Sequence, residues 1–195
     1  MPEAPGWHSR GFLPHYDDGA YLQAITYRLA DALPAEVVAK LEEQSLDDEL
    51  RREQFEHYLD AGHGYCVLRK PECAKAVVEN WRHFHGARYR LHAWVVMPNH
   101  VHILIGHQAG CTLSEIVQSW KSYTAKVILR HCANGQFPGN HVWQADYWDR
   151  FIRNERHYAS TVDYIHNNPV KAGLVTRPQD WPWSSAGSAG GPPAS

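Results

Sequence analysis

The sequence predicts an α+β fold in which helices pack on one face of an antiparallel sheet. Residues 22–29, 88–97 and 100–107 read as strands, because apolar and polar side chains alternate along them or β-branched residues are frequent. Residues 71–86 and the segment after Thr112 repeat their apolar side chains at helical spacing instead. The order strand, helices, paired strands, helix, strand, helix is typical of the ferredoxin-like type of α+β sandwich.

The first half of the chain is predicted to begin with the strand at 22–29. Residues 35–60 read as two short helices that form an acidic insertion, and a solvated charged surface is the simplest interpretation of them. The helix at 71–86 begins well, since Pro71 suits a first helical turn. Its apolar side chains recur at helical spacing, at Ala74, Val77, Val78 and Trp81.

Residues 88–107 are predicted to form a hairpin of two strands. In the first strand, Leu91, Ala93, Val95 and Met97 are expected on one side. Pro98-Asn99 is a turn signal, after which the chain returns as the second strand.

The second half is predicted to contain two helices around one more strand. Thr112 and Glu115 make a capping box for the first helix. Its expected apolar stripe is Leu113, Ile116, Val117, Trp120, Thr124 and Val127. The further strand is expected within 141–152. Asn154 then caps a helix that should end near Asn167, because Pro169 cannot continue it.

Composition indicates one globular domain at 21–184, with an N-terminal extension at 1–20 and a disordered tail at 185–195. We expect a cytoplasmic protein without membrane contact, because no apolar run is long enough to span a bilayer and no secretory signal is evident. The four cysteines form no C-x-x-C pair, which argues against a zinc knuckle or a disulfide framework.

Charge is distributed unevenly along the chain. Residues 1–65 hold 5 Lys/Arg and 13 Asp/Glu, a net charge of −8, and residues 66–195 hold 14 and 8, a net of +6. The basic part carries the chemical motifs described next, as contact with phosphate would favour.

His100 and His102 form the first of these motifs. Side chains two apart in a strand point to the same face, so both imidazoles could bind one ion while Val101 faces the core. His83-Phe84-His85 has the same pattern but ends a predicted helix, where residues two apart point about 200° from each other. We therefore expect only the pair at 100 and 102 to bind a metal.

Tyr164 and Asn168 form the second motif, one helical turn apart on the last predicted helix. With the histidine pair, they suggest metal-assisted attack of a phenolate on a phosphate ester. Asn168 precedes a proline and could fall outside the helix, which leaves His166 and Asn167 as alternative ligands. Without the histidines, a tyrosine at the domain surface would be the simpler interpretation of Tyr164.

Several segments together resemble the REP-associated tyrosine transposases, a group of the HUH single-tyrosine transposases. The resemblance covers roughly residues 20 to 185. It is carried by WVVMPNHVH at 94–102, WQ at 143–144, YWD at 147–149, IRN at 152–154, VDYIHNNPVKAGLV at 162–175 and WPWSS at 181–185.

The resemblance implies a function and a set of site residues. His100, His102 and Asn168 would bind Mg²⁺ or Mn²⁺, and Tyr164 would be the nucleophile that forms a 5′-phosphotyrosine link. The implied substrate is single-stranded DNA beside a palindromic REP-type hairpin, which the protein would cleave and rejoin as an endonuclease and strand transferase.

Cationic and aromatic residues are candidates for DNA contact, although each could equally be a solvated charge or a structural aromatic ring. The candidates are Lys121, Lys126, Arg130, Arg150, Arg153, Arg156, Lys171, Trp143 and Trp148. Two alternatives stay open: a domesticated nucleic-acid-binding protein that no longer cleaves, and a rolling-circle initiator or relaxase. The protein is expected to be a monomer or a homodimer.

Overall fold

The structure is a computed structural model that describes residues 7–9, 14–16, 22–43, 48–107, 110–132 and 141–187. Its centre is a four-stranded antiparallel sheet, with strands in the order β4-β5-β3-β6. These strands are β3 (Leu22–Arg28), β4 (Tyr89–Val96), β5 (His100–His107) and β6 (Trp148–Phe151). The predicted α+β class and the antiparallel sheet are confirmed.

The hairpin of β4 and β5 contains a bulge that changes which side chains share a face. The register shifts between Leu91 and Ala93, so His92 is an extra residue in β4. Ala93, Val95 and Met97 share one core cluster as predicted, but Leu91 belongs to the cluster on the other face of the sheet. The expectation for Leu91 was wrong because one inserted residue reverses the alternation that precedes it.

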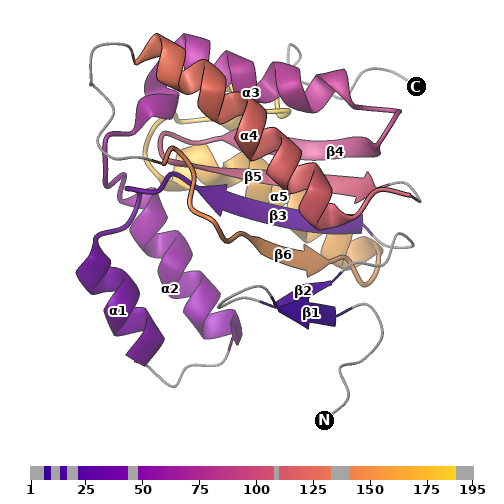
Figure 1. Ribbon diagram of the computed structural model, residues 1–195. Helices are drawn as coiled ribbons and strands as arrows, with labels where there is room; N and C mark the ends of the chain where they lie inside the picture. The colour runs from indigo at the N-terminus through magenta and orange to yellow at the C-terminus, as the bar shows by residue number, and fades with distance from the viewer. Residues whose placement is uncertain are drawn as a thin grey trace.

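Helices α3 (Pro71–His83) and α4 (Leu113–His131) cover one face of the sheet (Figure 1). Their buried side chains meet those of β3, β4 and β5 in the larger core cluster, whose centre holds Tyr27, Trp81 and Trp120. The capping box of Thr112 and Glu115 is present. In the helix stripe, Ile128 is fully buried where Val127 was expected.

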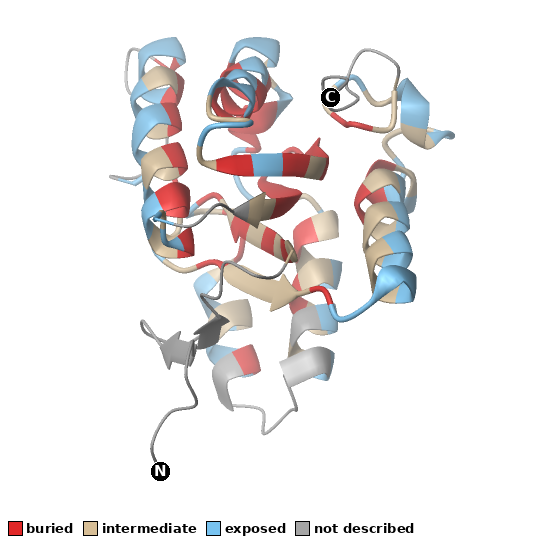
Figure 2. Cartoon of the chain, turned by 90° about the vertical axis from the view of Figure 1, so that its right-hand side faces the viewer, coloured by how far each residue is buried: buried red, intermediate tan, exposed pale blue. Residues whose placement is uncertain are grey.

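Helix α5 (Glu155–Lys171) covers the opposite face, so the sheet lies between two helical layers (Figure 2). Asn154 caps it by accepting a hydrogen bond from the His157 amide. The helix does not stop before Pro169 as expected, since it continues to Lys171 with the proline inside. The next amides still bond back into the helix, from Ala172 to Asn168 and from Leu174 to Pro169. Asn168 is therefore a helical residue.

The acidic insertion forms α1 (Ala35–Glu43) and α2 (Asp48–Asp60), which lie together beside the sheet (Figure 1). After α2 the chain passes through a 3₁₀ turn, η1 (Val67–Arg69), into α3. The N-terminal extension contributes a small hairpin of β1 (Trp7–Ser9) and β2 (Pro14–Tyr16), which contacts β6.

The C-terminal segment after α5 packs along the outer edge of β4. It includes a 3₁₀ turn, η2 (Pro178–Asp180), and Trp181, whose indole N–H donates to the Val96 carbonyl. Ser185, expected to begin the tail, is buried, and its amide and hydroxyl both bond to Trp94. This segment covers an edge that would otherwise expose unpaired backbone groups. Residues 188–195 of the expected tail lie outside the described residues.

Within the part of the chain that the structure describes, no helix combines the length and the apolar character that crossing a membrane requires.

Candidate active site

The pair His100 and His102 lies at the start of β5, on the sheet face that α5 covers. Both side chains are buried, with 1% and 3% of their surface exposed. Their Nε2 atoms are 3.1 Å apart and the two rings meet edge to face. The strand period therefore does bring both imidazoles to one point, as the sequence predicted.

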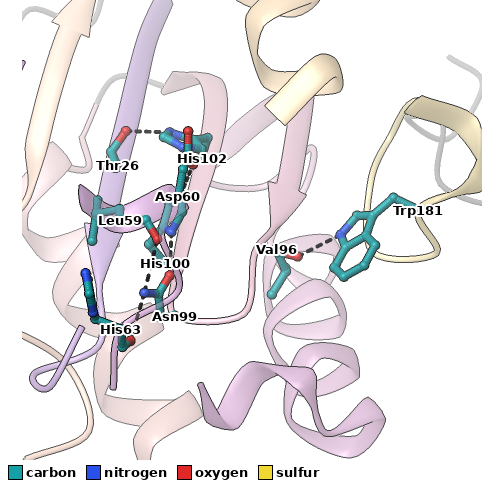
Figure 3. Close-up of polar contacts among 9 residues, drawn as sticks. All are labelled: Thr26, Leu59, Asp60, His63, Val96, Asn99, His100, His102 and Trp181. Carbon is teal, nitrogen blue, oxygen red and sulfur yellow. Dashed lines mark hydrogen bonds and ion pairs between the residues drawn. The ribbon is translucent and has the colours of Figure 1, made fainter. Parts of the chain in front are cut away.

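Two hydrogen bonds, one at the Nδ1 atom of each imidazole, orient these rings (Figure 3). The Nδ1 atom of His100 lies 2.8 Å from Asn99 Oδ1, and that of His102 lies 2.8 Å from Thr26 Oγ1. Because Asn99 Nδ2 donates to the carbonyls of Leu59 and His63, its Oδ1 must be the atom that accepts from His100. His100 thus carries its proton on Nδ1 and presents a lone pair at Nε2, the arrangement that a metal-binding imidazole needs.

Burial keeps His100 neutral. It lowers the pKa of this imidazole from its usual 6.5 to about 3, although the nearby Asn168 amide acts in the opposite direction. Burial therefore favours the unprotonated form of the His100 Nε2 atom.

Helix α5 places Tyr164 and Asn168 against this pair. The Tyr164 ring meets the His102 ring edge to face, with centroids 5.3 Å apart. Asn168 is fully buried, and its Oδ1 and Nδ2 find no hydrogen-bond partner of good geometry among the described residues. A buried amide without a partner is costly and calls for a ligand. The alternative ligands lie elsewhere: His166 bonds Ser185, and Asn167 is exposed.

The end of α2 brings carboxyl groups to the same place. Asp60 Oδ1 lies 3.8 Å from His100 Nε2, and Glu56 hydrogen-bonds the Tyr164 hydroxyl. Burial, followed by the negative charges of Glu56 and Asp60, raises the pKa of Tyr164. Burial and Glu56 also raise the pKa of Asp60 to about 6. Together with Glu53 and Lys171, these residues line an open pocket beside the tyrosine.

The second histidine pair is placed differently. His83 is the last residue of α3 and is exposed, with its ring against Phe84. His85 Nδ1 accepts a hydrogen bond from the Leu91 amide. As expected, these two imidazoles do not converge on one point.

Two of the candidates for DNA contact are corrected by the structure. The Lys121 ammonium donates to the carbonyls of Gln144, Ala145 and Asp146, which uses all three of its N–H groups. Trp143 is buried in the core, and its indole N–H donates to Thr124. Both side chains hold the segment before β6 on α4, so neither is available to a nucleic acid.

The other candidates divide between the two faces of the sheet. Lys126 and Arg130 are exposed on α4, on the face away from Tyr164. Arg153 and Arg156 are exposed at the start of α5, and Lys171 lies near its end with Nζ 4.7 Å from the centre of the Tyr164 ring. Arg150 and Trp148 are half-buried on β6, where Trp148 packs against Phe55.

Four residues at the site had no sequence prediction: Thr26, Glu56, Asp60 and Asn99. Asn99 could have been suspected from its position beside His100. Thr26 faces His102 only because β3 pairs with β5 in that register. Asp60 and Glu56 reach the site through the docking of α2, which no local pattern indicates.

The residues present fit a divalent cation. Ligands bonded at about 2.1 Å lie about 3.0 Å apart when they are octahedral neighbours, close to the 3.1 Å between the two Nε2 atoms. Among the described residues, no group of three His, Cys, Asp or Glu side chains is arranged to hold a metal. Any site must therefore use another donor, and the buried Asn168 amide lies beside the pair, close enough to affect the pKa of His100.

Comparison with known proteins finds REP-associated tyrosine transposases among the similar sequences. The REP-associated tyrosine transposase of Escherichia coli (strain K12) is 33% identical over 97 residues, covering 50% of this chain and 54% of that protein. A putative REP-associated tyrosine transposase of Haemophilus influenzae is 31% identical over 98 residues, covering 46% of this chain and 54% of that protein. The chain thus spans about half the length of the curated relatives it matches.

A solved structure, described as a REP-associated tyrosine transposase bound to a REP hairpin, shares the fold. It has a TM-score of 0.52 and 24% identity, and the match covers 92% of this chain and 83% of that one. The family described as "Transposase IS200 like" matches residues 71–168, which is half of the chain. This match includes the histidine pair and α5 through Asn168, and the chain belongs to the IS200-like transposase family.

Proposed function

We propose that this protein is a metal-dependent single-stranded DNA endonuclease and strand transferase that acts beside REP-type hairpins. The observation that carries the proposal is the convergence of four side chains from two elements, β5 and α5. The Tyr164 ring contacts the His102 ring, the Nε2 atoms of His102 and His100 are 3.1 Å apart, and the Asn168 amide is buried next to them. A protein that only binds DNA has no need of this combination.

In this proposal His100, His102 and Asn168 hold Mg²⁺ or Mn²⁺. When bound, the cation polarises the scissile phosphate and offsets the charge that develops on it. Asn99 and Thr26 keep the two imidazoles turned toward that position, because they occupy the Nδ1 atoms.

Tyr164 is the nucleophile. Its hydroxyl gives up a proton and attacks the phosphorus, the new bond links the tyrosine oxygen to the 5′-phosphate, and the broken P–O bond leaves a free 3′-hydroxyl. Burial makes the phenolate costly, so a proton acceptor and a cation are needed. Glu56 is hydrogen-bonded to the hydroxyl, and the Lys171 ammonium lies over the ring. A second 3′-hydroxyl reverses the reaction and joins two strands.

The proposed substrate is a DNA hairpin with a single-stranded flank. The relatives described above suggest the REP type. Exposed cations on the tyrosine's helix, Arg156 and Lys171, and Arg153 just before it are suited to contact the phosphates that flank the scissile bond.

The test is formation of a covalent adduct. The whole chain is incubated with Mn²⁺ and a hairpin oligonucleotide, and a protein–DNA band that survives denaturation is sought. Tyr164→Phe should abolish this band while hairpin binding remains within about twofold. Tyr158→Phe is the matched control, because Tyr158 lies on the same helix but bonds His92, and this variant should form the adduct.

Two outcomes would overturn the proposal. An adduct that persists in Tyr164→Phe removes this residue as the nucleophile. A wild-type protein that shifts the hairpin but never forms an adduct, with any divalent metal, is a binding protein and not a nuclease.

A further inference from the structure

We propose that a cavity between α2, β3 and the segment before β6 binds one unstacked base of the single-stranded DNA flank. The cavity prefers a base that carries both a carbonyl and an amino group. Guanine and cytosine carry both, whereas adenine lacks the carbonyl and thymine lacks the amino group. This inference rests on the proposed function, because the base belongs to the same DNA substrate.

The cavity is next to the histidine pair. In the sheet register, Thr26 on β3 is paired with His102 on β5 and with Trp148 on β6, so the three side chains form a row on one face. Thr26 Oγ1 lies 2.8 Å from His102 Nδ1 (Figure 3), and Thr26 and Trp148 both line the cavity. One imidazole ring therefore separates the cavity from the Nε2 atom at which the cation is proposed. A nucleotide beside the scissile phosphate could place its base there.

The size and the aromatic lining of the cavity suit a base. Its volume of about 60 Å³ has room for about five water molecules, which take up roughly 150 Å³ in the liquid. This is enough for one planar base and too little for a whole nucleotide. Phe55 and Trp148 meet edge to face in its wall, with ring centroids 4.3 Å apart, and Tyr147 adds a third ring. Aromatic rings are the surfaces on which proteins stack unpaired bases.

Three half-buried polar side chains, Arg28, Gln144 and Asp146, line the same cavity. The Arg28 guanidinium lies over the Phe55 ring, with its carbon 5.9 Å from the ring centre. Burial lowers the pKa of Arg28 and the charge of Asp146 raises it, yet within the described part of the chain these two side chains form no ion pair. The Gln144 amide group likewise makes no hydrogen bond to a described residue. Polar groups removed from water in this way usually have a partner, which suggests a ligand.

The chemistry of these groups determines which base fits. A guanidinium donates to a carbonyl oxygen, and a carboxylate accepts from an amino group. Arg28 and Asp146 together therefore match a base that presents both groups, and Gln144 can either donate or accept. The alternative occupant is ordered water, which a polar cavity of this size can hold. Water alone would give no preference among the four bases.

The experiment measures how tightly Tyr164→Phe binds REP-type hairpin oligonucleotides, by fluorescence anisotropy. This variant of the whole chain keeps the cavity and lacks the proposed nucleophile, so binding is measured without cleavage. The four bases are placed in turn at each position of the single-stranded flank. At one position, guanine or cytosine should be bound about 5- to 100-fold more tightly than adenine or thymine, the usual discrimination of a well-paired side chain.

Two further variants, made in the Tyr164→Phe protein, connect this preference to the cavity. Arg28→Met keeps the apolar stem over Phe55, and it should lose the preference over adenine because the donor to the carbonyl is gone. Asp146→Asn keeps the shape of the side chain, and it should lose the preference over thymine. Asp149→Asn is the matched control, because Asp149 bonds Gln23 and does not line the cavity, and it should keep both preferences within about twofold. Thermal melting checks that all variants fold.

The outcomes separate this inference from the proposed function. Affinity that is independent of the base at every position of the flank would overturn the inference, and so would preferences that Arg28→Met and Asp146→Asn both retain. If the wild-type chain forms no covalent adduct, but the preferences are present in Tyr164→Phe and are lost in the cavity variants, the base-binding cavity is supported and the nuclease function is overturned.

Discussion

The chain contains two His-x-His sequences, and the structure gives them different surroundings. His100 and His102 lie side by side on β5, buried beneath α5, with their Nε2 atoms 3.1 Å apart. His83 is exposed at the end of α3, and His85 accepts a backbone hydrogen bond in the turn that follows. The residue pattern is the same, so the difference comes from the backbone and from the neighbours.

The backbone conformation determines whether the two imidazoles point the same way. Residues two apart share a face in a strand but point about 200° apart in a helix. The neighbours decide next. In the pair on β5, Asn99 hydrogen-bonds the Nδ1 atom of His100, and Thr26 hydrogen-bonds that of His102. A His-x-His sequence is thus informative only together with the element it occupies and the residues that orient it.

Replacing both histidines of each pair in turn should have the largest effect. His100→Ala with His102→Ala removes two ligands and should weaken Mn²⁺ binding by more than about 100-fold, with loss of the covalent adduct. His83→Ala with His85→Ala should leave both within about twofold. Calorimetry and the denaturing gel measure the two quantities. If both double variants lost Mn²⁺ affinity and adduct formation equally, the assignment of the metal site to His100 and His102 would be wrong.

Asn99→Ala sharpens the comparison, because it leaves both imidazoles in place and removes what orients His100. We expect Mn²⁺ binding to weaken by about 10- to 100-fold, the usual range for a residue that orients a ligand. Asn167→Ala is the control, since this exposed amide donates to the Asp163 carbonyl of its own helix. Unchanged Mn²⁺ affinity in Asn99→Ala would mean that packing alone holds the His100 ring.

Features set by near neighbours in the sequence were predictable. The capping box at Thr112, the hairpin and the Asn154 cap each depend on residues within a few positions, and all are present. The common face of His100 and His102 follows from the strand period alone. The contact of Tyr164 with His102 was inferable only from the combination of residue types, and the fold places the two rings together.

Features set by distant contacts were not predictable. Pro169 stays inside α5 because the following amides and the packing of Asn168 sustain the helix. Lys121 and Trp143 were candidates for DNA contact, but the Lys121 ammonium donates to carbonyls of the segment before β6, and the Trp143 indole N–H donates to Thr124 on α4. The approach of α2 to His100 depends on Asn99, which is about forty residues away along the chain.

Asn168→Leu tests the buried amide on the other side of the site. It replaces a buried amide that makes no hydrogen bond of good geometry among the described residues with an apolar group of similar size, so the free energy of unfolding without metal should rise by about 1 kcal/mol. Mn²⁺ binding should weaken in the same variant. Denaturant unfolding in EDTA, followed by calorimetry, measures both. A variant that is less stable and binds Mn²⁺ normally would show that the amide serves the fold and not the cation.

The smallest expected effect is a difference in acid sensitivity between the two pairs, measured in EDTA. Burial lowers the pKa of His100 in the folded protein to about 3, below the unfolded value of 6.5. Between these values the unfolded chain binds a proton that the folded chain does not, so stability is lost as pH falls, by up to about 1.4 kcal/mol per pH unit. Asp60 acts in the opposite direction, because its pKa is raised to about 6 by burial and by Glu56.

The Asp60 contribution should be present in wild type and in His100→Leu, since it arises from burial and from charges other than His100. The difference between these two proteins therefore isolates the imidazole. Between pH 6 and pH 4, wild type should lose more stability in denaturant unfolding than His100→Leu. His83→Leu removes an exposed imidazole and should follow wild type. Parallel curves for wild type and His100→Leu would mean that the folded protein protonates His100 freely, which is incompatible with a nitrogen kept bare for a cation.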